Sequence, residues 1–138
     1  MNEKKMKILA AIPCYNEEAT IGSVVIKAKR YVDEVLVVDD GSIDDTANVA
    51  KEAGAKVISY EENKGKAYAI KRAFKYALEN DFDIIVTLDG DGTYAASYIP
   101  YFVQCLRRKE FDFISGNRFG FKGSLAMSPV CLLYTSPS

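Results

Sequence analysis

Short apolar runs alternate along this chain with segments whose apolar residues recur every three or four positions. Such runs are typical of strands that are buried on both faces, whereas the wider spacing is typical of helices that pack by one face. The predicted strands cover residues 7–13, 35–38, 56–59, 83–88 and 111–115. The pattern therefore predicts strands and helices in regular alternation.

A helix is expected between each strand and the next. The first follows Glu17 and Glu18, whose negative charges suit the positive end of a helix. Ser42 followed by Asp45 resembles a capping box that opens the second helix, and Gly54 ends it. The faces expected to pack on the sheet are Ile21, Val24, Val25 and Ala28 in the first helix, Ala67, Ile70, Phe74, Ala77 and Leu78 in the third, and Ile99, Phe102, Val103 and Leu106 in the fourth.

Repeated strand–helix–strand units predict an α/β fold, a Rossmann-like domain with a mainly parallel sheet and helices on both faces. In such sheets ligands bind beyond the carboxyl ends of the strands. The alternation stops after Arg118, and residues 131–138 contain no recognisable element. Because this octet also resembles translated sequencing-adapter DNA, we predict a non-native tail on a fold that is incomplete at its C-terminus.

Composition and charge narrow the function classes. The 138 residues fit one domain, and a net charge of −1 gives no support to a general nucleic-acid binder. The chain has no histidine, which excludes histidine-based catalytic triads and histidine-ligated zinc. Three scattered cysteines fit a reducing compartment, and the N-terminal apolar run is too short for a signal peptide. A cytoplasmic protein is therefore expected.

Aspartates follow two of the predicted buried strands: Asp39 and Asp40 follow the second, and Asp89 and Asp91 follow the fourth. In a parallel sheet both pairs lie at one edge, where two like charges about 4 Å apart repel by about 4 kcal/mol at an effective dielectric constant of roughly 20. Asp-x-Asp on a glycine-flanked turn suits a hard divalent cation, which prefers oxygen ligands. The simpler alternative, that these residues only form tight turns, stays open.

Other side chains are expected at the same edge. Tyr15 offers a flat face and a hydroxyl group that suit a nucleobase or a ribose, and Glu17 adds a hydrogen-bonding group. Lys66 lies near a predicted helix start, and Arg118 suits a phosphate clamp. Each has a structural alternative, which is helix capping for the glutamate and a solvated surface position for the two basic residues. The residues alone leave these alternatives open.

Taken in order, five segments resemble the inverting glycosyltransferases of the family 2 type, which have the GT-A fold, and above all the polyprenyl- and dolichol-phosphate sugar transferases. The matching segments are IPCYNEE (12–18), VVDDGS (37–42), NKGK (63–66), LDGDGTY (88–94) and GNRF (116–119). The resemblance implies that residues 1–130 form a partial nucleotide-sugar-binding domain, followed by the tail at 131–138.

The resemblance also implies a site. It makes Asp89 and Asp91 the ligands of Mg²⁺ or Mn²⁺ at the donor diphosphate, and it puts Arg118 beside phosphates on the acceptor side. These three residues would form the catalytic set. Thr93 departs from the pattern, because some relatives carry glutamine there. The implied nucleotide-binding residues are Pro13, Tyr15, Glu17, Asp39 or Asp40 with Asp39 favoured, Lys66 and Asp89.

The implied reaction moves a sugar, with inversion, from a UDP- or GDP-linked donor to an acceptor, a class that includes polyprenyl phosphates. The full-length protein is then expected to be cytoplasmic and peripheral to a membrane, with no nucleic-acid partner, and this fragment to bind donor without turnover. Two alternatives remain. A receiver-type phosphate-switch signalling module also carries acidic residues after buried strands, and a sugar nucleotidyltransferase shares the broad fold and the metal.

Overall fold

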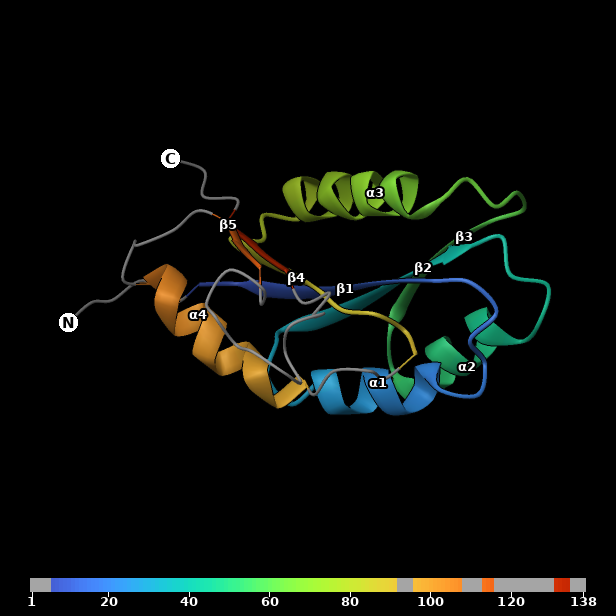
Figure 1. Cartoon of the computed structure of the whole chain (residues 1–138), viewed down its shortest axis with the longest axis horizontal. Coiled ribbons are helices and arrows are strands. Elements are labelled where there is room, and N and C mark those ends of the chain that lie inside the picture. Colours follow the sequence, from blue (N-terminus) through green and yellow to red (C-terminus); the bar gives the residue numbers. More distant parts are fainter. Residues whose placement is uncertain (1–5, 92–95, 108–112, 116–130, 135–138) are drawn as a thin grey trace.

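A computed structural model describes residues 6–91, 96–107, 113–115 and 131–134 of the chain. The strands in these ranges are β1 Ile8–Cys14, β2 Glu34–Asp40, β3 Lys56–Tyr60, β4 Ile84–Thr87, β5 Phe113–Ser115 and β6 Cys131–Tyr134. They form one sheet in the order β3-β2-β1-β4-β6-β5 (Figure 1). The strands β1 to β4 are parallel to one another, whereas β6 runs antiparallel to both of its neighbours.

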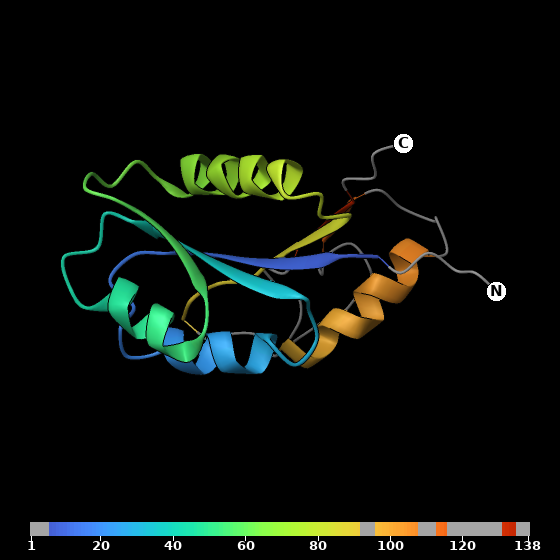
Figure 2. The same cartoon turned by 180° about the vertical axis from the view of Figure 1, so that it is seen from behind.

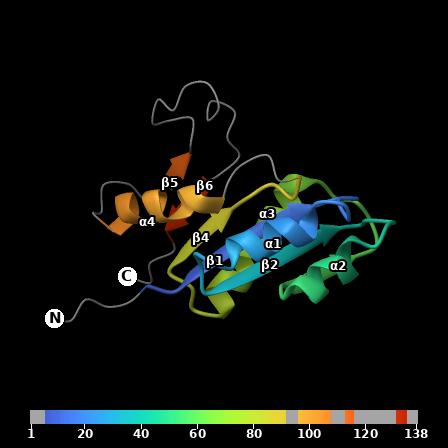
Figure 3. The same cartoon turned by 90° about the horizontal axis from the view of Figure 1, so that it is seen from below.

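Helices cover both faces of the sheet, as the alternating pattern predicted. They are α1 Ile21–Ala28, α2 Thr46–Ala53, α3 Lys66–Glu79, the short 3-10 helix η1 Ala96–Tyr98, and α4 Ile99–Arg107. Among the described helices, α3 lies alone on one face, while α1, α2 and α4 lie on the other (Figures 1 and 2). Within that second layer, α4 lies toward β6 and β5, whereas α1 lies over β1 and β2 (Figure 3).

The side chains of the central strands alternate between two buried layers. Ile12 of β1 and Val37 of β2 pack in the layer that contains residues of α1 and α2. Ala11 and Leu36 pack in the layer that contains the buried residues of α3. Because both faces are covered, these strands consist almost entirely of apolar residues, which explains the continuous apolar runs in the sequence.

The parallel arrangement brings the carboxyl ends of β1, β2 and β4 to one edge of the sheet. In the β1–β2 register Cys14 lies opposite Asp39. Directly after β4, Leu88 donates its backbone N–H to the carbonyl of Ala11 at 3.0 Å. The segments that leave these three strands therefore start close together, at the edge where ligands bind in parallel sheets. The predicted α/β fold with a mainly parallel sheet is confirmed.

The buried face of α3 differs from the predicted one. Ala67 and Leu78 were expected to pack on the sheet, yet both are exposed; the other predicted positions are partly or fully buried. The buried stripe instead consists of Ala69, Ala73 and Ala77, which lie four positions apart and so share one face of a helix. Alanine lets the helix backbone approach the sheet closely, so the small residues take the buried face and the larger leucine stays outside.

The predicted capping box at the start of α2 is also wrong. The helix begins at Thr46, and no side-chain hydrogen bond from Asp45 caps it. The hydroxyl of Ser42 instead accepts the backbone N–H of Asn16 at 2.8 Å, so this serine joins two loops. The predicted end of α2 at Gly54 is confirmed, because this glycine adopts a left-handed conformation with φ +106°.

A strand at Cys131–Tyr134 corrects the expectation that the last residues contain no element. β6 pairs with β4, with Leu133 opposite Ile85, and β5 pairs with its other side. The run is only four residues long, and a short apolar run fits a strand or a core helix segment equally well, so periodicity alone could not reveal it. The non-native origin of residues 131–138 stays a prediction, and residues 135–138 lie outside the described part.

A hydrogen bond ties α3 to the start of β2. Tyr76 Oη donates to the carboxylate of Glu34. Burial, together with this donation, raises the pKa of Tyr76 from 10.0 to about 12. Because the pKa in the folded chain lies above that in the unfolded chain, the neutral phenol stabilises the fold fully below pH 10, and this contribution is lost as the pH rises through 12.

We expect Tyr76→Phe to lower the free energy of unfolding by about 2 kcal/mol at pH 7, since the lost hydrogen bond has a charged acceptor. Urea unfolding followed by circular dichroism measures the difference. The difference in the free energy of unfolding between wild type and variant should decrease as the pH is raised from 10 toward 12. A difference that stays constant over this range would contradict the stabilising role of the neutral phenol.

Candidate functional site

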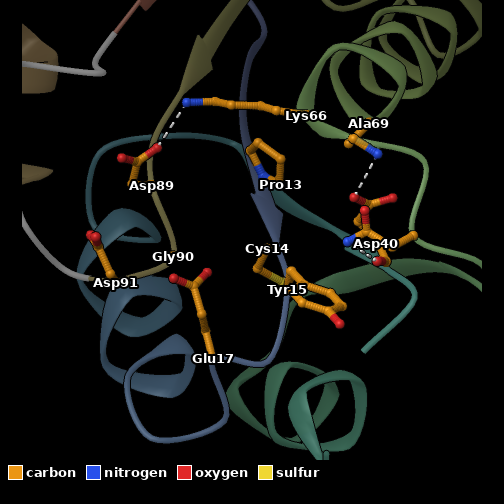
Figure 4. A pocket seen from close by; sticks show the side chains of 12 residues that line it. Pro13, Cys14, Tyr15, Glu17, Asp40, Lys66, Ala69, Asp89, Gly90 and Asp91 are labelled. Atoms are coloured by element: carbon orange, nitrogen blue, oxygen red, sulfur yellow. Dashed lines mark hydrogen bonds and ion pairs between the residues drawn. The ribbon is translucent and has the colours of Figure 1, made fainter. Parts of the chain in front are cut away.

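A cavity of about 370 Å³ lies at the carboxyl edge of the sheet, where β1, β2 and β4 end. Side chains from the loops after these strands and from the start of α3 surround it (Figure 4). The lining residues are Pro13, Cys14, Tyr15, Glu17, Asp40, Asn63, Gly65, Lys66, Ala69, Asp89, Gly90 and Asp91. Most of the polar side chains that the sequence predicted for this edge thus surround one cavity.

The β1–α1 loop carries Tyr15 and Glu17 to the cavity, and hydrogen bonds to the β2–α2 loop hold it there. The backbone N–H of Asn16 donates to Ser42 Oγ at 2.8 Å. In return, Asn16 Oδ1 accepts the backbone N–H of Ile43 at 2.9 Å. The asparagine has a φ of +53°, a left-handed conformation that its short polar side chain tolerates. The two loops therefore bind each other reciprocally.

Further bonds of the same kind continue along these two loops. The backbone N–H of Glu17 donates to the hydroxyl of the fully buried Thr46 at 2.9 Å. Glu18 donates its backbone N–H to Asp44 Oδ2 at 3.2 Å, and its own Oε1 accepts the backbone N–H of Asp45 at 2.7 Å. We call all these the cross-loop hydrogen bonds. Because backbone donors of each loop are satisfied by side chains of the other, neither loop can shift alone.

Asp39 and Asp40 end β2 and point to opposite faces of the sheet, because side chains alternate along a strand. Asp39 accepts the backbone N–H of Ser42 at 3.0 Å and the hydroxyl of Ser59 at 3.1 Å. It does not line the cavity, whereas Asp40 does. Asp40 rather than the favoured Asp39 is therefore the carboxylate that faces the cavity. Which of the two contacts a nucleotide stays a prediction.

Asp40 also anchors the start of α3. Its two carboxylate oxygens accept the backbone N–H groups of Lys64 at 2.8 Å and Gly65 at 2.9 Å. Its carbonyl accepts Asn63 Nδ2 at 3.2 Å. Gly41 packs directly on this loop, since a Cβ added to it would lie 2.6 Å from the backbone nitrogen of Asn63. This arrangement, the Asp40 clasp, fixes the backbone at the first turn of α3.

Lys66, the first residue of α3, reaches across the cavity to the acidic turn after β4 (Figure 4). Its Nζ lies 3.2 Å from Asp89 Oδ1. The lysine side chain is 58% exposed and the aspartate side chain 30% exposed. Ion pairs with this much solvent contact are weak and are screened by salt. The pair thus joins the two sides of the cavity through a contact that is readily broken.

The acidic turn after β4 packs tightly against the β1–α1 loop. Thr20 Oγ1 donates to the carbonyl of Gly90 at 2.7 Å. A Cβ added to Gly90 would lie 2.5 Å from Glu17 Oε1, so the lack of a side chain permits this approach. Burial raises the pKa of Glu17, and the charges of Asp91 and Asp89 raise it further. Three carboxylates therefore crowd one side of the cavity.

The ligand atoms on this side fit a hard divalent cation. Asp89 and Asp91 supply carboxylate oxygens, which Mg²⁺ and Mn²⁺ prefer. Within the described ranges, no group of three His, Cys, Asp or Glu side chains is arranged to hold a metal by itself. Mg²⁺ commonly binds through one or two carboxylates and completes its shell with water and substrate phosphates. The two aspartates therefore fit a cation that arrives together with a phosphate ligand.

Two positions singled out in the sequence, Thr93 and Arg118, lie outside the described residues.

The structure adds Cys14, Asn63 and Ala69 to the cavity wall. The thiol of Cys14 is buried, and burial, ahead of the nearby carboxylates, raises its pKa, which is typical of an unreactive structural cysteine. Cys14 and Asn63 belong to the matching segments 12–18 and 63–66, which is the sequence signal for them, whereas no sequence feature singled out Ala69.

Comparison with known proteins adds to this picture. The sequence profile of glycosyl transferase family 2 matches residues 10–127. Protein RfbJ of Shigella flexneri is 38% identical over 113 residues, a match that covers 80% of this chain and 84% of that protein. The dolichyl-phosphate hexose transferase of Haloferax volcanii is 39% identical over 107 residues, which cover 75% of this chain and 44% of the relative.

A solved structure agrees with the sequence matches. Glucosyl-3-phosphoglycerate synthase from Mycobacterium tuberculosis, in complex with Mn²⁺, UDP and glucosyl-3-phosphoglycerate, is similar with a TM-score of 0.73 and 25% identity. The match covers 94% of this chain and 57% of that one, so the chain spans about half the length of this protein and of the Haloferax relative. The predicted GT-A fold is confirmed, and the receiver and nucleotidyltransferase alternatives have no support.

Proposed function

Because the chain belongs to glycosyl transferase family 2, we propose that it binds a UDP- or GDP-linked sugar with Mg²⁺ or Mn²⁺ and serves transfer of that sugar, with inversion, to an acceptor. The observation that carries the proposal is the cavity, which has an aromatic ring and a clasped carboxylate on one side and an acidic turn with a lysine on the other. The proposed nucleotide-binding residues are Pro13, Tyr15, Glu17, Asp39 or Asp40, Lys66 and Asp89.

Each side of the cavity suits one part of the donor. Tyr15 is 46% exposed, and its ring offers a stacking face to a nucleobase. Asp40 has lone pairs to accept N–H or O–H groups of the base or ribose. On the opposite side, Lys66 offers an ammonium group to the diphosphate, and Asp89 and Asp91 would hold the metal. The cavity volume of about 370 Å³ lies within the range of small-molecule sites.

The leaving group of the proposed reaction is a nucleoside diphosphate, which gains negative charge as the bond to the sugar breaks. A bound Mg²⁺ or Mn²⁺ supplies Lewis-acid neutralisation of that charge. The ammonium of Lys66 adds positive charge at the same diphosphate. The hydroxyl of Thr20, which holds the carbonyl of Gly90 at 2.7 Å, keeps the acidic turn in place. The described residues thus bind and orient the donor.

For the acceptor we propose a polyprenyl phosphate. The Haloferax relative is named as a dolichyl-phosphate hexose transferase, which supports this class. A phosphate acceptor is already anionic, so it needs orientation more than deprotonation, and this suits a chain without histidine. Arg118 is the proposed contact for that phosphate. In the described part of the chain, no helix has the length and hydropathy that crossing a membrane requires.

Calorimetric titration of the purified chain with UDP and with GDP, each with Mn²⁺ and with a chelator, tests the donor site. We expect one nucleotide to bind with Mn²⁺ and to bind at least about tenfold more weakly with the chelator, because the two aspartates need a cation beside the phosphates. Circular dichroism establishes that the chain is folded. A folded chain that binds neither nucleotide would contradict the proposal.

A further inference from the structure

Lys66 is the one basic residue among the described residues that line the cavity, and it pairs with Asp89, a proposed metal ligand. We infer that Lys66 is the internal counter-ion of Asp89 in the donor-free protein and moves to the diphosphate when the metal binds, so that it couples metal binding to donor binding. This inference rests on the proposed function and adds a second role to the lysine.

The geometry allows this change of partner. The Asp40 clasp holds the backbone N–H groups of Lys64 and Gly65, so the helix start from which Lys66 projects is fixed. The side chain of Lys66 is 58% exposed, and its Nζ contacts the carboxylate of Asp89 at 3.2 Å. A lysine with a fixed backbone and a solvated ammonium can change rotamer at little cost. The ammonium can therefore exchange Asp89 for a phosphate within the same cavity.

The charges around the acidic turn give a reason for the exchange. Glu17, Asp89 and Asp91 all line one side of the cavity. Without a cation these carboxylates repel one another, and Lys66 partly relieves the repulsion. A divalent cation relieves it better, but it must first displace the ammonium from Asp89. Once displaced, the ammonium lies beside the site of an incoming diphosphate, where it gains a charge-assisted hydrogen bond.

The size of the expected coupling between metal binding and nucleotide binding follows from the strength of the Lys66–Asp89 ion pair. An exposed ion pair changes an equilibrium by a factor of about two to five. Loss of Lys66 should therefore strengthen binding of the metal alone and weaken binding of the nucleotide. By thermodynamic reciprocity, the metal and the nucleotide should also strengthen each other less in its absence. The two effects have opposite signs, which a simple loss of structure would not produce.

The test compares wild type, Lys66→Met and the matched control Lys64→Met. Lys64 lies two residues away and pairs with Glu62 at 3.4 Å, outside the cavity lining. Electron paramagnetic resonance measures Mn²⁺ binding without nucleotide, and calorimetry measures UDP and GDP binding with Mn²⁺. For Lys66→Met we expect about threefold tighter Mn²⁺ binding and about tenfold weaker binding of the preferred nucleotide. Lys64→Met should change neither by more than about 1.5-fold.

The outcomes separate this inference from the proposed function. The counter-ion role is overturned if Lys66→Met binds Mn²⁺ no more tightly than wild type. It is also overturned if Lys64→Met gains as much Mn²⁺ affinity over wild type as Lys66→Met does. If Mn²⁺ binding tightens but the nucleotide binds the variant as well as wild type, the move to the diphosphate is overturned. If folded wild type binds neither nucleotide while Lys66→Met gains Mn²⁺ affinity, the counter-ion role stands and the proposed function fails. Lys66→Gln replaces Lys66→Met if the latter does not fold.

Discussion

Gly41→Ala is expected to lower the free energy of unfolding by about 3 kcal/mol, the largest effect on stability that we predict. Gly41 has a φ of +78°, a left-handed conformation that costs other residues about 1–2 kcal/mol. A Cβ there would also lie 2.6 Å from Asn63 N and 2.7 Å from the carbonyl carbon of Glu62. These are backbone atoms, so relieving the overlap means opening the Asp40 clasp, which adds about 1–3 kcal/mol.

Gly54→Ala is the matched control for this prediction. Gly54 also has a positive φ, at +106°, but the atoms nearest to its Cβ would be those of the flexible Lys29 side chain, which can move away. We expect this variant to lose about 1–2 kcal/mol. Urea unfolding of both variants gives the comparison. Equal losses would mean that the contact of Gly41 with the β3–α3 loop does not restrict the fold.

Asp91→Asn is expected to weaken Mn²⁺-dependent nucleotide binding by at least about 30-fold, because the amide removes a charged oxygen ligand from the proposed metal site. The side chain of Asp91 is exposed, so we expect the free energy of unfolding to change by less than about 0.5 kcal/mol. Calorimetry with UDP or GDP in the presence of Mn²⁺ measures the binding, and urea unfolding measures the stability.

Asp81→Asn controls for the lost charge. Asp81 is exposed and precedes β4, at the opposite edge of the sheet from the cavity. Its φ of +61° suits asparagine, so the replacement brings no backbone strain. This variant should bind nucleotide like wild type. If Asp91→Asn also binds like wild type with Mn²⁺ present, the metal role of Asp91 is wrong.

The convergence of the site residues could be predicted from the sequence. Continuous apolar runs identified the buried strands, and the alternation of strands with helices made the sheet parallel. From these two points, Tyr15, Asp40 and Asp89 had to lie at one edge, because each follows the carboxyl end of a strand or terminates it. The cavity contains all three.

Contacts between loops could not be predicted in the same way. The spacing of Ser42 and Asp45 fits a capping box, but a local pattern does not show that the serine hydroxyl is taken by Asn16 from another loop. Likewise, alternation along β2 puts Asp39 and Asp40 on opposite faces, yet it does not tell which face α3 will cover. Both outcomes depend on tertiary partners that are distant in the chain.

The last strand, β6, shows a similar limit. The run at Cys131–Tyr134 pairs with β4 in the antiparallel direction, which an alternation of strands and helices does not predict. A short apolar run fits a strand or a core helix segment equally well until its neighbours are known. Only the register with β4 and β5 identifies it as part of the sheet.

The cross-loop hydrogen bonds have a consequence for the thermodynamics of ligand recognition. They restrict the β1–α1 and β2–α2 loops as the chain folds, so most of the conformational entropy of these loops is lost before a ligand arrives. Binding at Tyr15 then requires little further ordering, which is the benefit of preorganisation. The solvated ammonium of Lys66 lacks this restraint. The nucleoside end of the cavity is thus a rigid template, and adaptation to the ligand is concentrated at its charged end.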